Sequence, residues 1–145
     1  MPPWRDTALR MLPELTPEIE RAQEPYGLWA DLVQAFRAAY DSNPRDESLI
    51  KRIYEFSDWC IAAPRGETAD DDLPTSVCTC FYEEIPLHSA ARDDMPRWIR
   101  WQDFLGTEQI FRHGLLEEDF LRLKDHMRRN RDKYVDRPWP SNVQI

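Results

Sequence analysis

The apolar residues of this chain recur at helical spacing through most of its length, and this periodicity limits the folds that are open to it. The segment from about Pro44 to Ala62 is apolar on a broad face, which indicates a helix that packs on more than one side. The clearest single stripe, at steps of three and four residues, is Trp29, Leu32, Val33, Phe36 and Tyr40. These patterns predict an all-α fold.

Prolines and capping residues divide the helical pattern into short segments. The further helices that we expect cover residues 6–15, 16–24, 26–40, 73–85, 95–105, 107–112 and 115–131, with loops over 63–72 and 86–94. Residues 77–82 would also be tolerated in a strand, but no partner strand is visible, so we favour a helix. The sequence predicts a compact multi-helix domain of roughly six to seven helices packed as antiparallel hairpins, either as a bundle or as a short helical-repeat-like stack.

The length of 145 residues suits a single domain, and we expect residues 1–145 to form one. Residues 132–145 contain Pro138 and Pro140 and are predicted to form a non-helical tail. Trp139 lies between these two prolines, and its large apolar side chain is more stable when buried than in water, so we expect the tail to pack on the body of the domain.

Cysteine content and the start of the chain favour a reduced, cytoplasmic protein. The three cysteines are Cys60, Cys78 and Cys80, and the polar segment from Met1 to Asp6 has no apolar stretch behind it. Residues two apart on a helix diverge, so Cys78 and Cys80 are expected to be buried thiols rather than ligands of one metal ion. We expect no catalytic residue, cofactor or metal, because no nucleophile elbow, phosphate-binding loop, metalloprotease helix or calcium loop is present.

Charge is distributed unevenly along the chain. The net charge of −8 divides into −2 over residues 1–54, −10 over 55–119 and +4 over 120–145. This balance argues against nucleic-acid binding and against binding to anionic membranes. The acidic residues that could form a partner-binding face are Glu67, Asp70, Asp71, Asp72, Glu83, Glu84, Asp93 and Asp94. The alternative is a solvated acidic surface with the basic end of the chain partly against it.

Three short stretches resemble a family of small, all-helical bacterial proteins of unknown function. The first is the segment Leu49–Cys60, which contains Arg52-Ile53-Tyr54 and Trp59-Cys60. The other two are the run from Cys80 to Pro86 and the sequence Pro96-Arg97-Trp98-Ile99. The resemblance covers most of residues 8–127 and rests on aromatic packing positions. It implies a helical fold and brings no catalytic residue with it.

The leading hypothesis is a non-catalytic protein-interaction domain, in its most concrete form an immunity or antitoxin-like inhibitor whose acidic surface binds a basic protein. A second hypothesis is an enzyme with an unrecognised helical active site, using His88 or His113 with an acid. A third is a small-molecule module with a pocket lined by Trp29, Trp59, Trp98 or Trp101. The arginines around Trp98 and Trp101 suggest stacking on nucleobases, but the acidic surroundings favour packed tryptophans instead. The sequence does not set the oligomeric state.

Overall fold

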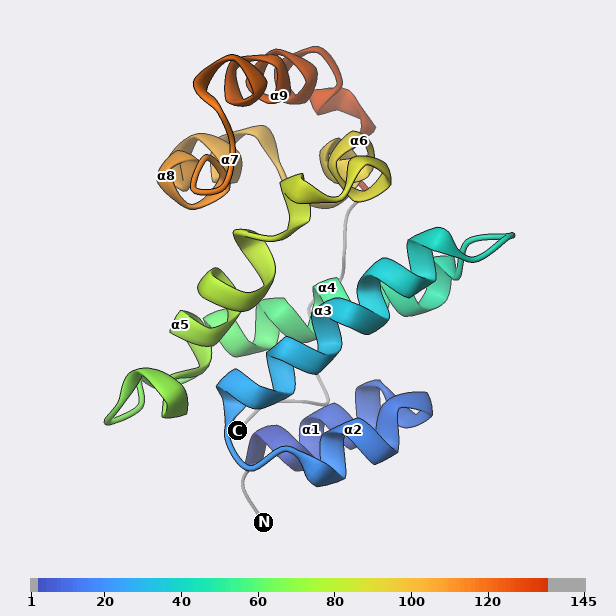
Figure 1. Ribbon diagram of the computed structural model, residues 1–145, viewed down its shortest axis with the longest axis vertical. Helices are drawn as coiled ribbons and strands as arrows, with labels where there is room; N and C mark the ends of the chain where they lie inside the picture. Colours follow the sequence, from blue (N-terminus) through green and yellow to red (C-terminus); the bar gives the residue numbers. More distant parts are fainter. Residues whose placement is uncertain (1–2, 136–145) are drawn as a thin grey trace.

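The computed structural model describes residues 3–135, and in this range the chain is helical with no strand (Figure 1). The predicted all-α class is confirmed. The expected number of six to seven helices is wrong, because residues 3–135 hold nine α-helices, several of them one or two turns long. Their bounds are α1 Pro3–Met11, α2 Thr16–Arg21, α3 Pro25–Asp41, α4 Glu47–Ile61, α5 Leu73–Val77, α6 Ser89–Trp98, α7 Trp101–Gly106, α8 Glu108–Phe111 and α9 Glu117–Arg129.

The described residues also form short 3₁₀ turns and one π-helical turn, which is wider than an α-helical turn. The 3₁₀ turns are η1 Pro13–Leu15, η2 Ala69–Asp71, η4 Ile85–Leu87 and η5 Arg131–Lys133. The segment η3, Cys78–Tyr82, is π-helical and continues α5. The predicted non-helical tail therefore begins with a 3₁₀ turn, and its residues 136–145, including Trp139, lie outside the described residues.

The helices are arranged in three tiers (Figure 1). Helices α1 and α2 form the first tier, α3 and α4 cross the middle, and α6 to α9 form the last, with α5 and η3 leading from the middle tier to the last. Helix α3 contacts α2, α4, α5 and α6, so it is more central than α4, although the broad apolar face of residues 44–62 made that segment our candidate for the central helix. Its place follows from its stripe, since Leu28, Trp29, Leu32 and Phe36 are all buried.

Aromatic side chains fill the core of the middle tier and of the last tier. In the middle tier Trp29 stacks on Phe56 and Phe81, and Phe36 meets Phe81 edge to face. In the last tier Phe104 stacks on both Phe111 and Phe120. Each such buried ring contributes about 1.5–3 kcal/mol through removal of apolar surface from water. The fold is held chiefly by this burial, which explains how helices of four to six residues persist.

Two boundaries differ from expectation around residues 86–105. The predicted loop over 86–94 is largely helical, because α6 begins at Ser89 with His88 as its cap, and the His88 Nδ1 atom accepts from the Ala91 N–H at 3.3 Å. The predicted helix over 95–105 is two helices, because the backbone is extended at Ile99 and Arg100. A third boundary differs at α4, because Asp46 caps this helix, accepting from the Leu49 N–H at 3.1 Å, so that it begins at Glu47 rather than at about Pro44 as predicted.

None of the helices in residues 3–135 has the length and apolar character that crossing a membrane requires.

Candidate ligand-binding pocket

A cavity of about 720 Å³ opens between the middle and last tiers. Its walls come from the end of α4, the α5–η3 segment, the end of α6 and the short helices α7 and α8. The lining residues are Asp58, Ile61, Ala62, Pro74, Cys78, Tyr82, Trp98, Ile99, Gln102, Asp103, Gly106, Thr107, Ile110 and Phe111. Most of these side chains are apolar or aromatic, and a few polar groups lie among them. This composition is typical of a pocket for a small organic molecule.

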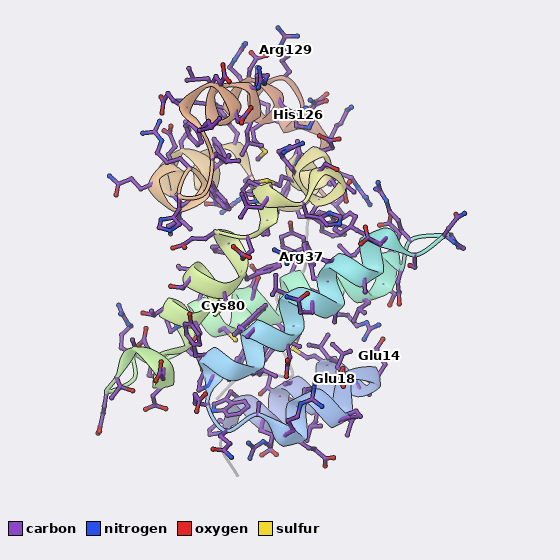
Figure 2. The ribbon with its side chains drawn as sticks, in the orientation of Figure 1. Glu14, Glu18, Arg37, Cys80, His126 and Arg129 are labelled. Carbon is purple, nitrogen blue, oxygen red and sulfur yellow. The ribbon has the colours of Figure 1, made fainter. Side chains whose placement is uncertain are left out.

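The π-helical segment forms one wall of the cavity. The Glu83 N–H donates to the Cys78 carbonyl at 3.0 Å, five residues back, so this turn holds one residue more than an α-helical turn. Cys78 and Tyr82 line the cavity, whereas Cys80 and Phe81 are buried on the core side. Figure 2 shows Cys80 beside α3, where its thiol lies 3.8 Å from the Tyr26 carbonyl. Such π turns are rare and occur often at functional sites.

A hydrogen-bond network around Asp94 fixes the opposite wall. The Trp98 Nε1–H donates to Asp94 at 2.9 Å, and the Tyr40 hydroxyl donates to the same carboxylate. Trp98 also stacks on Tyr54 with ring centroids 5.4 Å apart. Because burial and the Asp94 charge disfavour a phenolate, the pKa of Tyr40 is raised far above its ordinary value. The network ties α3 to α6 and holds the indole in one orientation.

The charged groups in the cavity wall are all acidic. Asp58 and Asp103 line it, and no basic side chain is among the lining residues in the described part of the chain. Asp103 is exposed and pairs with Arg100 at 2.9 Å, whereas Asp58 is half-buried at the end of α4. Of these two carboxylates, the one on α7 is therefore already paired with a basic side chain.

The predicted acidic face divides into residues with internal partners and residues without them. Asp72 is buried, pairs with Arg65 at 2.8 Å and accepts from the Gly66 and Thr75 N–H groups. These partners, Arg65 first, hold the pKa of Asp72 far below its ordinary value. Asp94 pairs with Arg97 at 3.0 Å. Asp72 and Asp94 therefore both stabilise the fold through internal partners.

Other acids of the predicted face have partners across the surface. Glu84 pairs with Arg37 of α3 at 2.8 Å, and Glu83 lies 3.5 Å from the His113 ring. Figure 2 shows Arg37 on the side of α3 that faces the α5–η3 segment. Glu67, Asp70 and Asp71 lie together on the loop before α5 and are exposed. Asp93 is exposed on α6, away from this loop in the sequence, and its carbonyl accepts from His126 at 2.8 Å.

The histidines and cysteines each have separate surroundings. His88 contacts Asp41 at 2.9 Å, and Figure 2 shows His126 of α9 on the side that faces α6. Neither these two nor His113 lines the cavity.

Cys60 is fully buried, and burial strongly raises the pKa of its thiol. Within residues 3–135 no group of three or more His, Cys, Asp or Glu side chains could hold a metal ion.

Of the four tryptophans considered from the sequence, one is at the cavity. Trp98 lines it, Trp29 and Trp59 are in the core, and Trp101 stacks on Phe104. Sequence reasoning missed Asp58, Tyr82, Gln102 and Thr107, which come together only when five separate segments pack. Comparisons of the chain with protein families, with curated proteins and with solved structures find no match.

Proposed function

We propose that this protein is a non-catalytic binding domain whose cavity between the middle and last tiers takes a small organic molecule with an apolar body. The observation that carries the proposal is the cavity itself. Its volume of about 720 Å³ is within the range of ligand pockets, roughly 300–1,000 Å³. Its apolar wall supplies affinity through burial of ligand surface, and its few polar groups supply orientation.

The polar groups of the α7 wall are held in place before any ligand arrives. The Thr107 hydroxyl donates to the Asp103 carbonyl at 2.6 Å, and Asp103 is itself paired with Arg100. Groups that are already ordered cost less conformational entropy on binding, which favours affinity. The rigid indole of Trp98 serves the same purpose on the opposite wall.

A blocked-cavity variant tests the proposal. Ala62 is exposed, lines the cavity and has ordinary helical backbone angles, so Ala62→Phe adds a ring at the wall without strain. A fragment screen by protein-observed NMR should find ligands that shift the methyl resonances of Ile61, Ile99 and Ile110. These ligands should lose binding to Ala62→Phe but keep it with Ala38→Phe, a matched change at an exposed site on α3. Equal binding to both variants would refute the proposal.

A second candidate function has its own observation. Glu67, Asp70 and Asp71 are exposed on the loop between α4 and α5, and none is ion-paired within the described part of the chain. The neighbouring Arg65 is already engaged by Asp72. This loop supports the immunity or antitoxin-like hypothesis, in which an acidic surface binds a basic protein and complementary charge speeds their association.

Charge reversal distinguishes this second candidate from the first. The triple variant Glu67→Lys, Asp70→Lys, Asp71→Lys leaves the capping residue Asp72 in place, so the fold should be retained. A basic partner captured on the immobilised protein should elute with a salt step and should no longer bind the triple variant. Retention of that partner by the variant would exclude the acidic loop as its docking site.

A further inference from the structure

We infer that the cavity is a docking site for the chain's own residues 136–145, and that Trp139 is the side chain that enters it. Three observations carry this inference. The described chain ends at the cavity wall, the wall is largely apolar and aromatic, and the sequence of this segment suits such a wall. The docking does not depend on the proposed function. Its consequence, that a cavity ligand must displace the segment, rests on that function.

The described chain ends beside the cavity. After α9, the turn η5 packs against α6, and the Val135 N–H donates to the Arg97 carbonyl at 2.7 Å. Figure 1 shows this end of the described chain next to α6. The two residues that follow Arg97 are Trp98 and Ile99, and both line the cavity. The hydrogen bond of Val135 therefore brings the start of the 136–145 segment to one wall of the cavity.

Trp139 is close enough in sequence to reach this wall. It follows Val135 by four residues, and four residues of extended chain span at most about 13–14 Å. The cavity of about 720 Å³ is within the range that holds a drug-sized molecule, roughly 300–1,000 Å³, and a single indole is smaller than such a molecule. Both the chain length and the volume therefore permit the side chain to enter.

The residues on either side of Trp139 favour docking against an apolar wall. Pro138 and Pro140 flank it, and each proline has a fixed φ angle and no backbone N–H. Fewer backbone donors then lose water on docking, and a stiffer segment loses less conformational entropy. Proline-rich segments commonly dock in grooves lined by aromatic side chains, and Tyr82 and Phe111 belong to this wall.

A second hollow beside α6 is a poorer match for an indole. It is lined by Arg92, Asp93, Asp119, Arg122, Leu123 and His126. All of these side chains except Leu123 are polar, and an indole placed among them would displace water without replacing its hydrogen bonds. Burial of an aromatic side chain removes about 150–250 Å² of surface from water, and this gain is largest where the surrounding wall is apolar. The cavity is therefore the better site for Trp139.

The variant Trp139→Ala, made in the full chain, tests the docking. Cys78 is a half-buried thiol of the cavity wall, so a docked indole shields it from iodoacetamide. Native-state labelling of Cys78 should be about tenfold faster in Trp139→Ala than in the wild type, which corresponds to about 1.4 kcal/mol of docking free energy. Labelling of the buried Cys60 should stay unchanged, which shows that the fold is intact. The matched control is Asn142→Ala, a change in the same segment that should leave Cys78 labelling unchanged.

Two further measurements report on the cavity directly. The methyl resonances of the three isoleucines in the wall should move in Trp139→Ala, because the ring current of the indole is lost, and should not move in Asn142→Ala. A docked segment also lowers the apparent affinity of a ligand in proportion to the fraction of open cavities. Dansylamide, a neutral probe whose emission increases in an apolar site, should therefore bind Trp139→Ala about tenfold more tightly than the wild type.

The outcomes separate this inference from the proposed function. Equal labelling and equal methyl shifts in the wild type and Trp139→Ala would overturn the docking, even if fragments bind the cavity. Faster labelling of Trp139→Ala, with no fragment or probe bound by either protein, would support the docking and count against the proposed function. An equal acceleration in Asn142→Ala would overturn the role of Trp139. Shielding of Cys78 that increases with protein concentration would also overturn the inference, because a second copy would then supply the indole.

Discussion

Tyr40 donates a hydrogen bond from its hydroxyl to the carboxylate of Asp94, and this contact joins the central helix α3 to the helix that carries the cavity tryptophan. The same carboxylate accepts from the Trp98 indole and pairs with Arg97. One acidic side chain thus satisfies three donors where two tiers of the fold meet.

We expect Asp94→Ala to be strongly destabilising, by about 3 kcal/mol, because it leaves the donors of Tyr40 and Trp98 without their acceptor. Urea denaturation measures the loss. Asp93→Ala is the matched control, since that neighbouring acid is exposed and should change stability by at most about 0.5 kcal/mol. Comparable losses in the two variants would show that Asp94 is not an organising residue.

Asp72 should contribute stability that depends on pH. Its pKa in the folded state is lower than its ordinary value, so its contribution is complete above the unfolded pKa, near about pH 4, and is lost as the pH falls below that. We expect Asp72→Asn to lower stability by about 1–2 kcal/mol at neutral pH through the weakened cap of α5. The difference between wild type and variant should shrink in acid.

Thermal melts from pH 7 to pH 2 measure this trend. Asp71→Asn serves as the control because Asp71 is the adjacent acid and is exposed. A gap between wild type and Asp72→Asn that stays constant over this range would contradict the assignment of Asp72 as a charged cap.

Cys78 should be the thiol that alkylating reagents reach first in the native protein. It is half-buried at the cavity, whereas Cys60 and Cys80 are buried. Burial, and then the charge of Glu83, raise the pKa of Cys78, so labelling should be slow at neutral pH and should accelerate as the pH rises beyond about 8.5, the ordinary thiol value.

Peptide mapping by mass spectrometry after iodoacetamide treatment identifies the labelled site. Cys78→Ser should remove native-state labelling, and a saturating cavity ligand should slow it in the wild type. Faster labelling of Cys80 than of Cys78 would be inconsistent with the described walls of the cavity.

Arg52 should anchor the first tier to the middle tier. Its guanidinium donates to both oxygens of Glu14 at 2.6 Å and to the Met11 carbonyl at 3.1 Å. Figure 2 shows Glu14 in the α1–α2 tier, facing the α3–α4 tier. We expect Arg52→Gln to cost about 1 kcal/mol, the upper range for partly exposed pairs. Arg21→Gln, which removes a longer 3.5 Å contact to Asp31, should cost less in the same chemical denaturation assay.

The helical class could be predicted because apolar spacing reports directly on helix faces, as the stripe from Trp29 to Tyr40 demonstrates. The start of α6 could not be predicted, because its cap is the imidazole of His88, and histidine is not among the usual capping residues. Asp94 was therefore placed before a helix when it lies inside one. Its three donors come from α3 and α6, a meeting that no local pattern encodes.

The cavity could not be predicted from the sequence for a related reason. Its walls come from residues 58 to 111 in separate segments, and only Trp98 had been considered as a pocket residue. The π turn at Cys78–Tyr82 has no sequence signature of its own, since the same residues are compatible with an α-helix. The acids of residues 67–94 were visible as a group, but their ion pairs depend on the tertiary positions of Arg37, Arg65 and Arg97.

The wide turn at Cys78–Tyr82 also determines how this region responds to a change in chain length. It accommodates one residue more than an α-helical turn of the same rise. Deleting Thr79 would convert it into an ordinary α-helical turn, and the residues after the deletion would keep nearly the same orientation around the helix axis, because the wide turn holds the one additional residue. Tyr82 would therefore stay near the cavity wall, and the last tier would still meet the middle tier through the same face. A single-residue deletion here should thus be tolerated, whereas one within a regular helix such as α4 would rotate every later residue of that helix by about 100°.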